Sequence, residues 1–154
     1  MDTMHTYKVK ASATRLRSGV AVSDATPQAI EFSAPPEFLG EAGVWTPEAF
    51  FVAAVVTCFV STFSGMADLS KLRFASLDVD AEGKLDRDAT GWKFTAITLR
   101  PDLKIMEERD RDRASRILEK AERACLIARS ISAAITLEPS IAVASESQVP
   151  ESVA

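Results

Sequence analysis

The sequence predicts an α+β fold in which antiparallel sheets surround long central helices. Apolar and polar residues alternate in residues 7–14 and 76–85, which is the pattern of half-buried strands. Residues 46–68 form a long apolar segment that begins with a helix start signal, and residues 107–124 repeat apolar residues at helical spacing. A chain of 154 residues is long enough for one well-packed core, so we expect a single domain over residues 1–138.

The first strands are expected to form a hairpin. Ser18-Gly19 offers a tight turn into a strand over residues 20–22. If the alternation of residues 7–14 continues up to this turn, Arg15 and Arg17 lie on the inward face of the strand. Arg17 then lies at the tip of the hairpin. Arginines at strand ends also commonly extend to water, and the pattern supports that interpretation equally. The apolar members of the first strand are Tyr7, Val9, Ala11 and Ala13.

The central apolar helix begins with a clear signal. Thr46 suits the N-cap, Pro47 the first helical position and Glu48 the positive end of the helix dipole. Residues 49–67 carry no charge, so we expect this helix to be covered on nearly every side, in part by a second copy of the chain. Its length would also span a membrane. Its hydroxyl residues, the absence of a basic flank and its charged neighbours favour a helix of a soluble domain.

The remaining elements follow from the same patterns. Short strands are predicted at residues 29–33 and 135–137, and two longer strands at 76–85 and 92–103. Residues 139–154 are rich in Ser, Glu, Pro and Ala, and we expect them to form a loosely held tail.

The second helix, over residues 107–124, is amphipathic and is followed by a short helix over residues 126–132. The apolar positions fall at offsets of 0, 3, 4 and 7 residues, and a cysteine at offset 11 extends the same face. The second cysteine is therefore predicted to face the core. The residues of this face are Ala114, Ile117, Leu118, Ala121 and Cys125.

Composition excludes several kinds of function. The net charge of −4 gives no reason to expect a nucleic-acid partner. His5 is the only histidine, so Ser-His-Asp catalysis, Cys-His catalysis and His/Cys metal sites lack their parts, and no glycine-rich phosphate loop appears. We therefore expect neither metal nor cofactor. The N-terminus has no secretion signal, so a cytoplasmic location is expected, where thiols stay reduced.

The two cysteines are the remaining source of chemistry. A thiol with a pKa near 8.5 is only about 3% thiolate at pH 7, whereas a pKa of roughly 6 makes it about 90% thiolate. Because burial opposes ionisation, a cation is expected to be needed at Cys58. Arg17 or Arg15 is the available cation, and Glu48 is the candidate carboxylate to hold it. Two buried cysteines that only fill space remain the alternative.

The motifs resemble the OsmC/Ohr family of osmotically inducible and organic hydroperoxide resistance proteins. The similarity rests on Thr46-Pro47-Glu48, then Thr57-Cys58-Phe59, then a core-facing cysteine at 125 before a final strand, and it covers roughly residues 6–138. It implies an OsmC-like fold and an intertwined homodimer with two sites at the interface. It also implies reduction of organic hydroperoxides and recharging by a dithiol such as a dihydrolipoyl group.

The resemblance assigns a role to each candidate residue. Cys58 is the peroxidatic cysteine and Cys125 the resolving cysteine that condenses with its sulfenic acid. Arg17 lowers the thiolate pKa and polarises the peroxide, and Glu48 orients Arg17. Ten residues of straight helix separate Glu48 from Cys58 by ~15 Å, so the Arg17 and Glu48 that serve one Cys58 are expected to come from the other subunit.

The sequence departs from the family pattern in three places. Leu126 stands where peroxidase members usually have proline, Ala128 where a small polar residue is common, and the glycine before Arg17 is missing. These departures leave the resolving step and the choice between Arg15 and Arg17 open. Two other functions therefore stay in view: a non-catalytic dimer that binds a hydrophobic small molecule between its subunits, and a purely structural or interaction protein.

Overall fold

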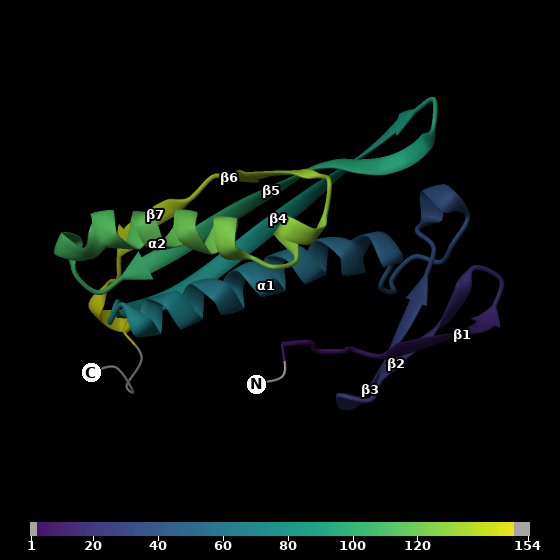
Figure 1. The fold of residues 1–154 in the computed structure, drawn as a ribbon, viewed down its shortest axis with the longest axis horizontal. Coiled ribbons are helices and arrows are strands. Elements are labelled where there is room, and N and C mark those ends of the chain that lie inside the picture. The colour runs from purple at the N-terminus through teal and green to yellow at the C-terminus, as the bar shows by residue number, and fades with distance from the viewer. Residues whose placement is uncertain (1–2, 150–154) are drawn as a thin grey trace. The chain divides into compact units, whose positions relative to one another are not determined.

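A computed structural model describes residues 3–149 of the chain (Figure 1). The chain divides into two compact units, Met1–Phe51 and Val52–Ala154, where the sequence predicted one domain over residues 1–138. The division follows from the strand pairing, because the first three strands and the last four form separate sheets in the described part of the chain.

The first unit contains an antiparallel meander. Its strands are β1 (Val9–Arg15), β2 (Ser18–Ser23) and β3 (Thr26–Ser33). Leu16 and Arg17 form the first turn, and Arg17 adopts a left-handed backbone with φ 63°. The predicted hairpin with Arg17 at its tip is confirmed, but its turn was placed wrongly at Ser18-Gly19, since both of these residues begin β2. A Cβ on Gly19 would lie 2.5 Å from the Ser12 carbonyl oxygen. Glycine is therefore required because the two strands approach closely at this position, and not because the chain turns there.

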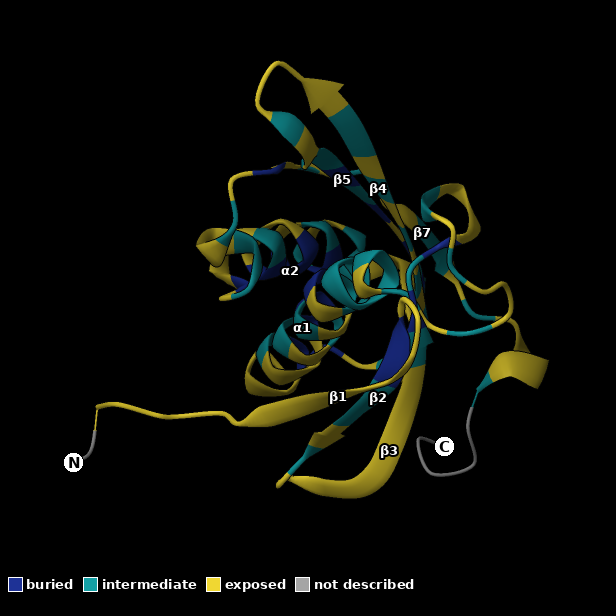
Figure 2. Cartoon of the chain, turned by 90° about the vertical axis from the view of Figure 1, so that its right-hand side faces the viewer, coloured by how far each residue is buried: buried dark blue, intermediate teal, exposed yellow. Residues whose placement is uncertain are grey.

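Of the two interpretations of Arg15 and Arg17, the single chain fits the one in which they extend to water. Both residues are exposed, as is every residue of β1 (Figure 2). The alternation in β1 therefore does not correspond to a buried and a solvated face. The third strand is confirmed and begins three residues earlier than expected, at Thr26.

The start of the central helix, α1 (Pro47–Leu69), forms as the sequence predicts. The Thr46 hydroxyl accepts a hydrogen bond from the Ala49 N–H at 3.0 Å, which is the N-cap contact. The rings of Trp45 and Phe50 stack with centroids 5.5 Å apart and planes 7° apart. An apolar residue before the N-cap packed on one in the first turn fixes the angle at which the chain enters a helix.

The second unit is built on a four-stranded mixed sheet. Its strands are β4 (Phe74–Asp88), β5 (Gly91–Ile105), β6 (Ala134–Leu137) and β7 (Ser140–Val143). β4 and β5 form a long antiparallel hairpin, whereas β6 and β7 each pair parallel to β5. The prediction of antiparallel sheets therefore holds for the hairpin and not for β6 and β7.

The predicted loose tail is wrong in its first part. Ser140–Val143 forms β7, and a short 3-10 helix follows at Glu146–Gln148. Pro139, which cannot donate a backbone hydrogen bond, separates β6 from β7. The parallel pairing to β5 supplies the order that composition did not indicate. Residues 150–154 of the predicted tail lie outside the described residues.

The core of the second unit lies where two helices cover one face of the sheet (Figures 1 and 2). The second helix, α2 (Arg111–Ala124), buries the predicted face, and β5 buries alternate residues. The short predicted helix after α2 is a 3-10 turn at Ala128–Ser130. The large buried apolar residues are Val55, Phe59 and Phe63 of α1, Ile97, Leu99, Leu103 and Ile105 of β5, and Ile117 and Leu118 of α2.

The uncharged helix α1 is covered less than the sequence predicts. Only one stripe is fully buried, at every fourth residue: Val55, Phe59, Phe63 and Ala67. Its length and mean hydropathy of 1.9 also meet the criterion for a membrane span, and 17% of that apolar window is buried. A single copy of the chain therefore leaves much of α1 uncovered.

Candidate active site

The two cysteines come together in the second unit. Cys58 lies in the middle of α1 and is half-buried, whereas Cys125 lies directly after α2 and is fully buried. The Cys125 N–H donates to the Ala121 carbonyl at 2.9 Å, and a ψ of 111° then turns the chain out of the helix. The prediction that Cys125 faces the core is confirmed. No disulfide joins the two cysteines, and the Cys125 thiol acts as a donor that lowers the pKa of Cys58.

The surroundings of Cys58 lower the pKa of its thiol. Burial acts in the opposite direction and raises that pKa. Hydrogen bonds from the backbone N–H of Ile127, the thiol of Cys125, the hydroxyl of Thr62 and the backbone N–H of Leu126 outweigh it. The Thr62 oxygen lies 4.0 Å from the sulfur, one helical turn after Cys58. Donors of this kind stabilise the thiolate relative to the thiol.

The surroundings of Cys125 act in the other direction. Burial raises the pKa of Cys125, and the neighbouring Cys58 sulfur raises it further, against hydrogen bonds from the N–H groups of Ala128 and Ile127. The Cys125 sulfur also lies 3.9 Å from the Val55 carbonyl oxygen, which can accept its proton in a weak hydrogen bond. Of the two thiols, Cys58 therefore has the lower pKa and ionises at the lower pH.

No arginine is among the groups that lower the pKa of Cys58 in this single chain, and the prediction that a cation from a partner copy lowers it stays a prediction. The groups that lower it are two backbone amides, a thiol and a hydroxyl. Of these, only Thr62 has a signal in the sequence, since a hydroxyl four residues after a helical cysteine lies on the same face. The amides of Leu126 and Ile127 were missed because main-chain donors leave no mark on residue type.

The two candidate arginines differ in their partners. The Arg15 guanidinium makes a two-pronged ion pair with the Glu41 carboxylate, which raises the pKa of Arg15. Within residues 3–149, the Arg17 guanidinium makes no ion pair or hydrogen bond. Only its backbone carbonyl is engaged, and it accepts from the Ala34 N–H at 2.9 Å and the Ser33 hydroxyl at 3.4 Å. Of the two, Arg17 is thus the arginine that is available to another group.

Glu48 presents a carboxylate oxygen without a partner. It lies in the first turn of α1 and is half-buried, and its Oε2 atom is buried with no hydrogen-bond donor among the described residues. The predicted pair of Glu48 with Arg17 does not form within this single chain as far as residues 3–149 describe it. A buried carboxylate oxygen is normally hydrogen-bonded, so Glu48 is suited to receive a donor.

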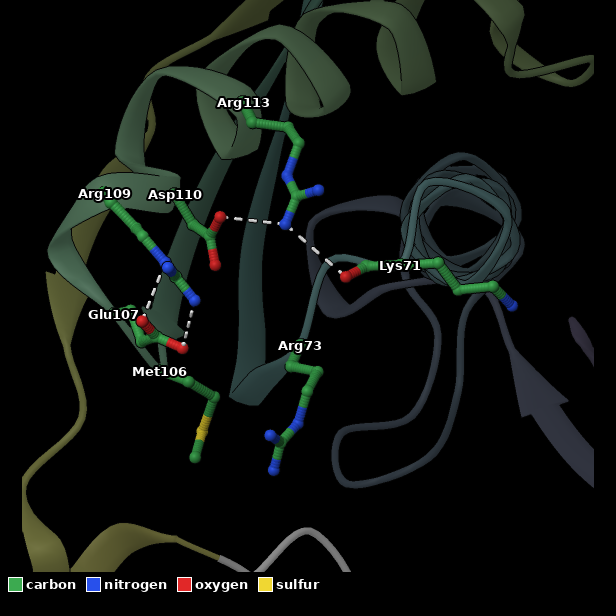
Figure 3. Close-up of a pocket in the computed structure, with 7 residues that line it drawn as sticks. All are labelled: Lys71, Arg73, Met106, Glu107, Arg109, Asp110 and Arg113. Atoms are coloured by element: carbon green, nitrogen blue, oxygen red, sulfur yellow. Dashed lines mark hydrogen bonds and ion pairs between the residues drawn. The ribbon is translucent and has the colours of Figure 1, made fainter.

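A concavity of about 350 Å³ lies in the second unit beyond the end of α1 (Figure 3). Ion pairs already occupy most of its charges: Arg109 with Glu107 and Arg113 with Asp110, each at 2.8 Å. Arg113 also donates to the Ser70 carbonyl at 3.1 Å. The bond from Arg113 to Ser70 links the start of α2 to the connection after α1. The lining residues are Lys71, Arg73, Met106, Glu107, Arg109, Asp110 and Arg113.

That concavity is separate from the cysteine pair. The end of α1 at Leu69 lies eleven residues beyond Cys58, or roughly 16 Å along the helix axis. The Lys71 ammonium points away from the other lining residues (Figure 3). Across residues 3–149, no group of three or more His, Cys, Asp or Glu side chains is placed to hold a metal ion.

Comparisons with known proteins give the chain a family. The model of the OsmC-like protein family matches residues 40–140. An uncharacterised protein of Bacillus subtilis, YmaD, is 24% identical over 137 residues, which cover 87% of this chain and 91% of YmaD.

Solved structures share the fold across nearly the whole chain. An OsmC-like protein of unknown function from Vibrio cholerae superimposes with a TM-score of 0.81 at 21% identity, covering 89% of this chain and all of that one. An organic hydroperoxide resistance protein OsmC from Legionella pneumophila superimposes with a TM-score of 0.73 at 22% identity, covering 92% of this chain and all of that one. The matched family model spans most of the chain and includes both cysteines, so this protein belongs to the OsmC-like family.

Proposed function

We propose that this protein is a thiol-dependent peroxidase that reduces organic hydroperoxides through Cys58 and Cys125. The observation that carries the proposal is the hydrogen-bonded cysteine pair, in which the pKa of Cys58 is lowered and that of Cys125 is raised. A thiolate is the nucleophile that attacks an O–O bond, and a neighbouring thiol is the group that resolves the product. Organic hydroperoxide resistance proteins are also among the structures that share this fold.

The first step oxidises Cys58. Its thiolate attacks the terminal oxygen of the hydroperoxide, an S–O bond forms and the O–O bond breaks. Sulfur loses two electrons to become a sulfenic acid, and the departing alkoxide takes a proton from solvent to become an alcohol. Because Cys58 is half-buried, the sulfur is positioned between the core and a surface from which a substrate can approach.

The second step consumes the Cys125 thiol. Its sulfur attacks the sulfenic sulfur of Cys58, an S–S bond forms, and the hydroxyl leaves as water with the proton of Cys125. A dithiol reductant then transfers two protons and two electrons to the protein by thiol–disulfide exchange and is itself released as a disulfide. The interaction of the two thiols, which shifts their pKa values in opposite directions, supports this pairing of Cys58 with Cys125.

A second copy of the chain completes the site in this proposal. Glu48 has a buried oxygen without a donor, and the Arg17 guanidinium is unpaired within residues 3–149. Since about 15 Å of helix separates Glu48 from Cys58, the pair that serves one thiolate comes from the partner. The role of Arg17 there is to polarise the peroxide, with Glu48 orienting it.

The exposed stripe of α1 supports this dimer. It consists of small residues, and its hydroxyls bond to carbonyls of the same helix: Thr57 to Ala53 at 2.7 Å and Ser64 to Val60 at 2.9 Å. Hydroxyls satisfied in this way can be covered without loss of hydrogen bonds. Small side chains also permit close helix packing. The exposed stripe comprises Ala54, Thr57, Ser61, Ser64 and Gly65.

The apolar character of α1 suits an alkyl hydroperoxide better than hydrogen peroxide. Val55, Phe59 and the half-buried Val56 and Val60 flank Cys58 on its own helix. An alkyl group placed against such residues leaves water, which stabilises the bound organic substrate. The proposal includes a cytoplasmic location, where dithiol reductants are available and the cysteines return to the thiol state.

Intact mass spectrometry after one equivalent of cumene hydroperoxide tests this function. We expect a loss of two hydrogens in the native protein, reversed by dihydrolipoamide, and a gain of one oxygen in Cys125→Ser. Cys58→Ser is expected to remain unmodified. Unchanged mass in the native protein, or full peroxide turnover by Cys58→Ser, would contradict the proposal. Unchanged mass together with an apolar ligand released on denaturation would favour a binding protein instead.

A further inference from the structure

Ser33 is fully buried, and its hydroxyl uses every hydrogen-bonding position that it has. It accepts from the Ser18 hydroxyl at 3.0 Å and from the Glu41 N–H at 2.8 Å, and it donates to the Arg17 carbonyl at 3.4 Å. A serine hydroxyl has one donor and two acceptor positions, so all of them are occupied. This side chain at the end of β3 therefore joins the β1–β2 turn, the start of β2 and the connection that leads to α1.

The turn residue that this hydroxyl holds, Arg17, has an unfavourable backbone conformation. Its φ of 63° lies in the left-handed region, which a residue with a Cβ rarely adopts. The Arg17 carbonyl accepts two hydrogen bonds, from the Ser33 hydroxyl and from the Ala34 N–H at 2.9 Å. Such conformations persist where surrounding contacts hold them, and they are frequent at functional sites. The two bonds fix the turn from which the Arg17 side chain projects.

The connection after β3 folds back closely enough to reach the same hydroxyl. The Gly40 N–H donates to the Pro35 carbonyl at 3.1 Å, which closes the loop. A Cβ on Gly40 would lie 1.5 Å from the Ala34 carbonyl oxygen and 2.8 Å from the Ser33 hydroxyl oxygen, so this return requires glycine. The next residue, Glu41, then presents its N–H to Ser33. The hydroxyl that holds the Arg17 turn is thus itself held by this loop.

We propose that Ser33 is a positioning residue for Arg17, and that its hydroxyl keeps the turn in the conformation from which the guanidinium polarises the hydroperoxide. The inference rests on the proposed peroxidase function and deepens it, because it states what fixes the arginine before substrate arrives. A misplacement of about 1 Å in a group that orients a reaction can lower its rate roughly a hundredfold. The contact between Ser33 and the Arg17 backbone should therefore affect peroxide reduction although Ser33 touches no reacting atom.

Ser18→Ala is the matched control for Ser33→Ala. Each variant removes one buried hydroxyl of the same hydrogen-bonded pair, so each is expected to lower the free energy of unfolding. Only Ser33→Ala also removes a donor from the Arg17 carbonyl. A serine pair that serves only stability would give both variants the same activity, whereas a positioning role separates them.

Hydrogen exchange at the Ala34 N–H, followed by NMR, measures the turn without any peroxide. In Ser33→Ala we expect this N–H to exchange at least roughly fivefold faster than in the native protein, because its acceptor, the Arg17 carbonyl, is less firmly held. In Ser18→Ala the exchange rate of Ala34 should stay near the native value.

The second measurement is kcat/KM for cumene hydroperoxide in a double-mutant cycle. Ser33→Ala should lower it about tenfold or more, whereas Ser18→Ala should change it less than about twofold. In an Arg17→Ala background, Ser33→Ala should cause no further loss, because no guanidinium remains to be positioned. Circular dichroism establishes that each variant is folded.

A further variant removes the other donor to the Arg17 carbonyl and leaves Ser33 intact. Lactic acid, the α-hydroxy analogue of alanine, at position 34 replaces the amide by an ester and keeps the methyl side chain. It should reproduce the loss of kcat/KM. This variant keeps the test decisive where Ser33→Ala does not fold, since native activity in the ester variant then contradicts the proposal.

Three results overturn the positioning role: equal kcat/KM in Ser33→Ala and Ser18→Ala, a native exchange rate of Ala34 in Ser33→Ala, or a further loss from Ser33→Ala in the Arg17→Ala background. Failure of the proposed function has a different signature. The native protein then consumes no hydroperoxide, while Ala34 still exchanges faster in Ser33→Ala than in the native protein.

Discussion

The Cys125 thiol donates a hydrogen bond to the sulfur of Cys58, which stands 67 positions earlier in the chain. This contact makes the two cysteines chemically different although both are thiols of the same core. Cys58 receives donors from four groups, whereas Cys125 is fully buried and lies next to a sulfur that favours negative charge. The two thiols should therefore react at different rates and in a fixed order.

The first prediction concerns the order in which the cysteines react. The pKa of Cys58 is lowered, so its thiolate forms at a lower pH than that of an ordinary thiol, while the raised pKa of Cys125 delays ionisation to a higher pH. At pH 7, brief treatment with iodoacetamide should label Cys58 well before Cys125. Peptide mass spectrometry measures both sites in one sample. Equal labelling at pH 7, or earlier labelling of Cys125, contradicts the assignment.

The second prediction separates the two arginines. Arg17→Lys should lower kcat/KM for cumene hydroperoxide at least tenfold, because lysine cannot reproduce two-pronged guanidinium contacts. Arg15→Lys is the matched control, since Arg15 pairs with Glu41 on an exposed surface, where such pairs contribute about 0–1 kcal/mol to stability. Activity in Arg15→Lys should stay near the native value. The reverse pattern would transfer the role to Arg15.

The third prediction tests the α1 stripe as a dimer contact. Ser64→Arg places a long charged side chain among small residues on the exposed side of α1 and should convert the proposed dimer to monomers. Light scattering coupled to size-exclusion chromatography measures the mass. Glu119→Arg changes an exposed residue of α2 and should leave the mass unchanged. A native protein that is monomeric, or a Ser64→Arg protein that stays dimeric, would refute the contact.

The fourth prediction addresses the core that positions Cys125. Leu118 is fully buried on α2, and Leu118→Ala should lower the free energy of unfolding by about 2–5 kcal/mol through lost burial and a residual cavity. Leu16→Ala makes the same change at a residue that is 84% exposed, and its effect should stay within about 0.5 kcal/mol. Chemical denaturation gives both values. Similar losses for the two variants would mean that Leu118 is not part of a tightly packed core.

Local signals in the sequence determined the elements that depend on neighbouring residues. The N-cap at Thr46 forms because its hydroxyl needs only the N–H of Ala49, three residues away. The apolar face of α2 is buried because a spacing of three and four residues aligns side chains on one side of any helix. The same spacing correctly predicts that Cys125 faces the core.

Elements that depend on distant partners were misplaced or missed. Gly19 resembles a turn residue, yet it lies in β2. Glycine is required there because the Ser12 carbonyl oxygen of the neighbouring strand leaves no room for a Cβ. The composition of Ser140–Val143 is typical of a loose tail, but the segment forms a strand because it pairs in parallel with β5. The residues of a strand do not indicate whether another strand has an unpaired edge with which it can form hydrogen bonds.

The sequence by itself determined the family, the two cysteines, and the helices that carry them. Only the tertiary structure decided what surrounds the sulfurs: which backbone N–H groups reach Cys58, that Cys125 donates to it, and that Arg15 is already paired with Glu41. The physical reason is that amides are the same at every residue. The direction in which these amides point depends on how the turn after α2 packs against α1. That packing cannot be inferred from the residue types in the turn.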